Sequence, residues 1–174
     1  MSRYTPFILI ALLLTTAQAS ERLALVIGNG NYQKPVPTLD NPVNDANDMA
    51  KVLRKLGFEV ILKHNLSNRA MTEAIQTFGD RLAQKRGVGL FYFSGHGLQA
   101  KGRNFLVPVD AKIKKAADIP WEALDANRLL AQMEEANNGV NIVILDACRD
   151  NPYQSNIKSL NKKGLAEMKS PTGS

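Results

Sequence analysis

The chain has 174 residues, a length typical of one domain, and 44% of them are hydrophobic, which is enough for a substantial core. The formal net charge is +6, but the basic residues are dispersed and are not interleaved with aromatic residues. This pattern is typical of a solvated surface, so we expect no nucleic-acid partner. The single cysteine excludes an internal disulfide.

The first 19 residues predict a secretory signal peptide. Arg3 precedes the apolar run 7–14, and Ala17-Gln18-Ala19 has the small-x-small pattern of a signal peptidase site. The run is too short to span a bilayer stably, and the alternative is a retained N-terminal anchor. We therefore expect a periplasmic or extracellular protein that contacts a membrane only through this signal during export. The mature chain would begin near Ser20.

The first half of the mature chain alternates between strand and helix patterns, which predicts a parallel α/β sheet. Short apolar runs predict strands at 23–27 and 58–62. Apolar residues at helical spacing predict helices at 42–56 and 68–82, with Asn41 and Ser67 as their N-caps. Gly28 and Gly30 follow the first strand, but the third glycine of a dinucleotide-binding loop is absent. We therefore assign no nucleotide site there, and we assign His64 no role.

The second half continues the alternation. Buried strands are predicted at 88–93 and 140–145, a small hairpin at 98–108 and a helix at 124–135. Residues 153–174 are polar and basic with only scattered apolar side chains, which predicts a linker or tail.

His96 and Cys148 come just after the two buried strands of this second half. The carboxyl ends of parallel strands form the ligand crevice of an open α/β sheet, so we expect the two side chains to lie close together. A cysteine and a histidine placed in this way suit a thiolate nucleophile with an acid/base partner. Composition alone leaves a second interpretation open, in which Cys148 is a buried and inert thiol.

Two segments resemble the caspase and metacaspase superfamily, and most of all its bacterial metacaspase-like members. They are Tyr92-Phe93-Ser94-Gly95-His96-Gly97 and Asp146-Ala147-Cys148-Arg149-Asp150-Asn151-Pro152. The histidine lies 52 positions before the cysteine, close to the spacing of the caspase signature. The resemblance covers residues 22–152 and implies a catalytic domain of the caspase large-subunit type at 20–152. It implies an α/β fold, a three-layer αβα sandwich with a mostly parallel central sheet.

The resemblance also implies a cysteine endopeptidase that hydrolyses peptide bonds with a Cys-His dyad. Cys148 would attack the peptide carbonyl, and His96 would take up the thiol proton and protonate the leaving amine. The backbone N–H groups of Gly97 and Cys148 would form the oxyanion hole.

The residues that the resemblance places in the S1 pocket are Asp45, Asp146 and Ser94. Caspases carry a glutamine at the position of Asp146 and an arginine in the first loop, and these receive an acidic P1 side chain. The acidic residues here predict protein or peptide substrates with Arg, and more weakly Lys, at P1. Each residue also has a simpler interpretation: Asp45 complements a helix dipole, and Asp146 and Ser94 are turn residues.

Caspase-like sheets usually continue with two more strands after the nucleophile, and we expect these C-terminal strands to be lacking here. A partner chain that completes the sheet is one consequence, and a non-catalytic caspase-like binding or regulatory module is the alternative function. Calcium activates many metacaspases, but no acidic residues match that site, so we assign no metal and no cofactor.

Overall fold

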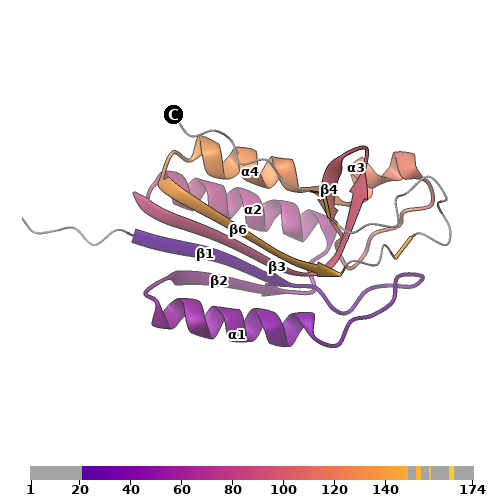
Figure 1. Cartoon of the computed structure of the whole chain (residues 1–174), viewed down its shortest axis with the longest axis horizontal. Coiled ribbons are helices and arrows are strands. Elements are labelled where there is room, and N and C mark those ends of the chain that lie inside the picture. The colour runs from indigo at the N-terminus through magenta and orange to yellow at the C-terminus, as the bar shows by residue number, and fades with distance from the viewer. Residues whose placement is uncertain (1–20, 149–151, 154–156, 158–164, 167–174) are drawn as a thin grey trace, which may run out of the picture.

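The structure is a computed structural model, and it describes residues 21–148, 152–153, 157 and 165–166. At its centre lie parallel strands in the order β2-β1-β3-β6 (Figure 1). Their bounds are Glu59–His64 for β2, Glu21–Gly28 for β1, Gly87–Ala100 for β3 and Gly139–Cys148 for β6. The strands predicted from short apolar runs are therefore confirmed.

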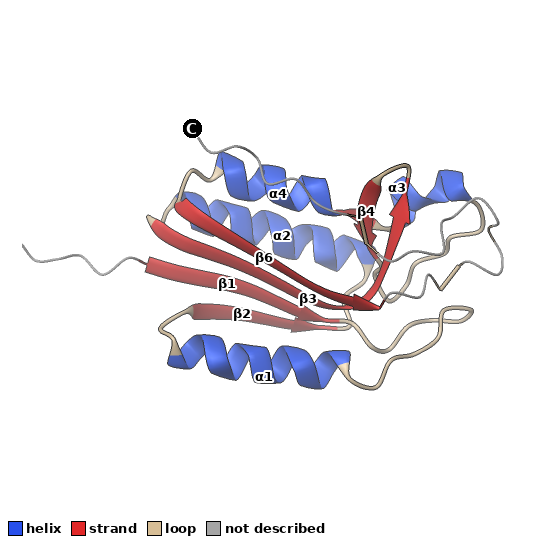
Figure 2. Cartoon of the chain, in the orientation of Figure 1, coloured by secondary structure: helices blue, strands red, loops and turns tan. Residues whose placement is uncertain are grey.

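Helices cover both faces of this sheet (Figure 2). Helices α2 (Asn68–Ala83) and α4 (Ala126–Glu135) lie on one face, and α1 (Pro42–Lys55) lies on the other. Alternate residues of β1 pack into the core on either side, which explains why its sequence is continuously apolar. This arrangement is the α/β sandwich expected from the sequence.

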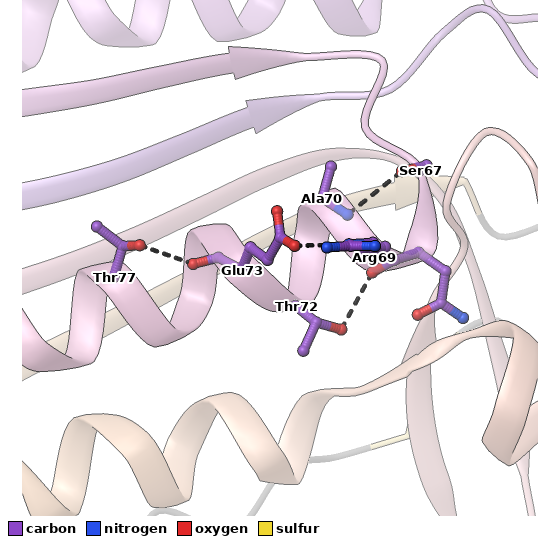
Figure 3. A network of polar contacts seen from close by, with 7 residues as sticks. Ser67, Arg69, Ala70, Thr72, Glu73 and Thr77 are labelled. Carbon is purple, nitrogen blue, oxygen red and sulfur yellow. Dashed lines mark hydrogen bonds and ion pairs between the residues drawn. The ribbon is translucent and has the colours of Figure 1, made fainter.

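The start of α2 follows the predicted pattern, whereas the start of α1 does not. The Ser67 hydroxyl accepts a hydrogen bond from the Ala70 N–H at 3.3 Å, and Arg69 and Glu73 pair one turn apart along α2 (Figure 3). Asn41 was expected to cap α1, but its backbone is helical and its side chain makes no capping bond to the described residues. Pro42 opens the helix with its fixed φ instead.

The predicted hairpin at 98–108 is confirmed. The last residues of β3 pair antiparallel with β4 (Arg103–Leu106). Lys101 and Gly102 form the turn, both with positive φ (50° and 75°), as a two-residue hairpin turn requires.

The segment between β4 and α4 contains elements that the sequence did not predict. A 3₁₀ turn (Ala116–Asp118) and the short helix α3 (Ile119–Glu122) lead into the two-residue strand β5 (Leu124–Asp125), which pairs with β4. Helix α4 therefore begins at Ala126 and not at 124. The Asp125 carboxylate accepts a hydrogen bond from the Asn127 N–H at 3.0 Å and caps the helix.

Within 153–174, the stretch expected to form a polar tail, the described residues contact the domain. Tyr153 and Ile157 are buried in a cluster with Leu98 and Phe105. The Asn104 side chain exchanges two hydrogen bonds with the backbone at residue 166. These positions therefore belong to the packed structure.

In the part of the chain that the structure describes, β2 forms one edge of the parallel sheet and β6 forms the other. Within these residues β6 pairs with β3 alone, and Val140, Ile142 and Ile144 are exposed on it. The predicted signal peptide at 1–19 lies outside the described residues. In the described ranges, no helix combines the length and the apolar character needed to cross a membrane.

Candidate active site

His96 and Cys148 occupy directly opposite positions on adjacent strands. The parallel register of β3 and β6 runs from Gly87 opposite Gly139 to His96 opposite Cys148. The expectation that the two residues come just after their strands is wrong, because β3 stays extended to pair with β4 and β6 follows it to Cys148. The pairing itself brings the two residues together, although the position of the thiol lies outside what the structure describes.

The His96 imidazole is buried and held by a backbone carbonyl. Its Nε2 lies 2.9 Å from the Pro37 carbonyl oxygen. A carbonyl oxygen can only accept, so Nε2 carries the proton and Nδ1 of the neutral ring keeps its lone pair. Nδ1 is buried, and no atom of the described residues forms a hydrogen bond with it, so its lone pair has no donor among those residues.

Burial also sets the charge of this histidine. It lowers the pKa of His96 below the ordinary value of 6.5, and the hydrogen bond to the Pro37 carbonyl offsets part of that effect. The imidazole is therefore neutral at neutral pH, which is the form that can accept a proton.

Tyr32 is a second support of His96 that sequence reasoning missed. Its hydroxyl oxygen accepts a hydrogen bond from the His96 N–H at 2.8 Å, and the two rings lie 4.6 Å apart in a tilted contact. Tyr32 and Pro37 both belong to the loop between β1 and α1. The Asn65 side chain holds this loop by accepting hydrogen bonds from the N–H groups of residues 30 and 31, both at 2.9 Å.

The glycines around His96 are required by close contacts. A Cβ atom at Gly95 would lie 2.6 Å from the Tyr32 hydroxyl oxygen, and one at Gly97 would lie 2.9 Å from the Ala147 Cβ. Gly97 follows His96 on β3, one position beyond the register pair with Cys148. The backbone N–H groups predicted for the oxyanion hole thus come from neighbouring strands, and their role stays a prediction.

The three residues predicted for the S1 pocket come together. Ser94 lies opposite Asp146 in the β3–β6 register, and its hydroxyl donates to the Asp45 carboxylate at 3.3 Å. Asp45 lies in the first turn of α1 and is partly buried, whereas Asp146 is exposed. Two carboxylates therefore flank one serine at this end of the sheet.

Tyr92 belongs to this group as well, although its sequence position suggests only a core residue. Its hydroxyl donates a hydrogen bond to Asp146 Oδ2 at 3.2 Å. Burial, reinforced by the negative charge of Asp146, raises the pKa of Tyr92 to about 12. The phenol is therefore a permanent donor at neutral pH.

The remaining candidates of the sequence lie apart from this site. His64 is exposed at the end of β2. Gly28 packs against the Pro42 backbone and Gly30 against the Leu39 backbone, so these glycines serve close packing of the loop. Among the residues that the structure describes, no three His, Cys, Asp or Glu side chains gather as metal ligands.

Comparison with known proteins identifies the family of the chain. The model of the caspase domain family matches residues 21–172. The chain belongs to the caspase domain family. The predicted resemblance is therefore confirmed, and the α/β sandwich described above is a caspase domain.

Two relatives of this caspase domain are mammalian. The chain is 35% identical to human mucosa-associated lymphoid tissue lymphoma translocation protein 1 over 144 aligned residues. This alignment covers 82% of this chain and 17% of the human protein. The mouse homologue matches with the same identity and coverage. Zebrafish caspase a is 34% identical over 65 residues, 37% of this chain and 17% of that protein. The chain thus spans 17% of the length of these curated relatives.

Proposed function

We propose that this caspase domain is a cysteine endopeptidase that uses Cys148 as its nucleophile and His96 as its base. The observation that carries the proposal is the register of β3 and β6, which places His96 opposite Cys148. The carbonyl of Pro37 supports it further, because it holds the proton on Nε2 and leaves Nδ1 as the acceptor.

The reaction follows from these positions. Nδ1 of His96 takes the thiol proton, and the thiolate attacks the peptide carbonyl carbon. The N–H groups of Gly97 and Cys148 stabilise the oxyanion, and the imidazolium returns its proton to the leaving amine. Water then enters, gives a proton to the same imidazole and hydrolyses the thioester, which restores the thiol.

We further propose that the enzyme cleaves proteins or peptides after Arg, and less efficiently after Lys. Asp45 and Asp146 supply two carboxylates near the nucleophile strand, tethered to the hydroxyls of Ser94 and Tyr92. A guanidinium group matches carboxylates with planar, bidentate hydrogen bonds, whereas an acidic P1 side chain would be repelled.

Export of the protein and a partner chain also remain proposals. The apolar run and the cleavage pattern of residues 1–19 support export. The open side of β6 in the described chain, with Val140, Ile142 and Ile144 exposed, supports a partner that adds a strand there.

Turnover of matched peptides that differ only at P1 tests the function. We expect cleavage after Arg, weaker cleavage after Lys and none after Asp, and we expect the Cys148→Ala variant to be inactive. Preference for Asp, or activity that survives Cys148→Ala, would overturn the assignment. Absence of turnover with all three peptides would favour the non-catalytic binding module.

A further inference from the structure

We propose that Tyr92 is a positioning residue of the S1 pocket, which fixes the Asp146 carboxylate and thereby sets the preference for Arg over Lys. This inference rests on the proposed function, because it concerns how the same site recognises P1.

The central strand presents two hydroxyl groups on one face. Tyr92 and Ser94 are two positions apart on β3, so their side chains point to the same side of the sheet. The Ser94 hydroxyl reaches Asp45 on α1, and the Tyr92 hydroxyl reaches Asp146 on β6. Each carboxylate of the pocket is thus tethered to β3 by a different hydroxyl.

Asp146 needs such a tether more than Asp45 does. Asp45 is partly buried and lies on a helix, whereas Asp146 is exposed on β6. An exposed carboxylate changes rotamer freely, and ordering it on binding costs free energy. The Tyr92 hydroxyl donates its hydrogen bond to Asp146 Oδ2, and Asp146 Oδ1 receives no hydrogen bond from this hydroxyl.

The donor is itself rigid and does not ionise near neutral pH. Tyr92 is 4% exposed, and its ring packs with Val26 and Leu90 in the core beneath α1. Its burial, and to a smaller extent the negative charge of Asp146, raises the pKa of Tyr92 and keeps the phenol protonated. Tyr92 therefore holds Asp146 in one orientation before substrate arrives.

This orientation matters for Arg and much less for Lys. A guanidinium group pairs with a carboxylate in a fixed planar geometry, so it gains from a carboxylate that is already oriented. An ammonium group is a compact point charge with rotatable donors, and it adapts to either carboxylate orientation. Loss of the tether should therefore weaken recognition of Arg selectively.

The test is Tyr92→Phe, which removes the hydroxyl and keeps the packed ring. We expect kcat/KM for an Arg-P1 peptide to fall about 10-fold, almost entirely through KM, while the value for the Lys-P1 peptide falls less than about 2-fold. The matched control is Tyr153→Phe, a second buried tyrosine outside this group, which should leave the Arg to Lys ratio unchanged. An equal loss for both peptides, or a loss confined to kcat, would overturn the inference.

A binding measurement separates this inference from the proposed activity. In the Cys148→Ala background, which does not turn over substrate, calorimetry measures the Kd of acetylated peptide amides that end in Arg or Lys. We expect Tyr92→Phe to raise the Kd for the Arg peptide about 10-fold and to change the Kd for the Lys peptide little. If this shift occurs but the unmodified chain cleaves nothing, the activity fails and the positioning role stands. An unchanged Arg affinity, or no affinity for either peptide before the substitution, would overturn the inference.

Discussion

His96 on β3 and Cys148 on β6 lie opposite each other in the parallel register of two hydrogen-bonded strands. Paired residues of adjacent strands project to the same side of a sheet. The backbone positions of the proposed dyad are therefore set by strand pairing, while the loop between β1 and α1 holds the His96 ring. Sites on strands are held more precisely than sites on loops, which favours a preorganised catalytic pair.

The acid limb of the pH profile should reflect the buried histidine. Because burial lowers the pKa of His96 below 6.5, the imidazole stays neutral, and able to act as a base, at lower pH than an exposed histidine. We expect kcat/KM to fall on acidification with a midpoint below 6.5. His64→Gln, which removes the exposed histidine, should leave the profile unchanged. A midpoint at or above 6.5 would contradict this account.

The two carboxylates of the proposed S1 pocket should each matter for basic substrates. We expect Asp45→Asn and Asp146→Asn to lower kcat/KM for Arg-P1 peptides about 10- to 100-fold, mainly by raising KM, because each removes a charge that pairs with the guanidinium. Asp48→Asn is the control, since Asp48 is an exposed carboxylate one turn further along α1 that pairs with Lys51. Similar losses in all three variants would argue against a specific acidic pocket.

Removal of the Tyr32 hydroxyl should disturb the base without disturbing substrate binding. In Tyr32→Phe the buried N–H of His96 loses the acceptor that lies at 2.8 Å, which should lower the free energy of unfolding by about 1–3 kcal/mol. We expect kcat to fall about 10-fold with little change in KM, because small misplacements of a catalytic group are costly. Denaturant unfolding and steady-state kinetics measure the two effects. A change in KM alone would show that Tyr32 acts elsewhere.

Gly95 should tolerate no side chain. In Gly95→Ala the new Cβ atom would meet the Tyr32 hydroxyl at 2.6 Å and the Asn29 carbonyl oxygen at 3.0 Å. We expect a loss of about 1–3 kcal/mol in unfolding free energy together with a loss of activity. Gly102→Asn provides the comparison, because its turn is open and asparagine tolerates positive φ. Equal stability of the two variants would contradict the packing described around His96.

Much of the fold could be predicted because it depends on periodicity. The buried strands are continuously apolar, and the apolar faces of α1 and α2 repeat at helical spacing, so their positions follow from the sequence. The start of α4 could not be predicted, because the two residues before it pair with β4, a contact with a segment distant in the sequence. The helical backbone of Asn41 likewise depends on how the preceding loop enters α1.

For the candidate site as well, some residues could be predicted from the sequence and others could not. The spacing of His96 and Cys148 and the positions of the acidic residues lead to the proposed chemistry, but they do not reveal the residues that support His96. Tyr32 and Pro37 lie in a loop without periodicity, and their contacts to His96 exist only in three dimensions. Tyr92 has the sequence context of a core residue, and only the structure places its hydroxyl on Asp146.

The most direct test of the central claim is covalent labelling of the chain's only cysteine. Matched peptidyl chloromethyl ketones with Arg or Asp at P1 alkylate a thiolate with loss of chloride, and the product can be followed by mass spectrometry of the peptide that contains Cys148. The account predicts rapid labelling at Cys148 by the Arg reagent, at least about 10-fold faster than by the Asp reagent, and a large loss of rate in His96→Gln. Equal rates for the two reagents, or a rate that does not depend on His96, would contradict it.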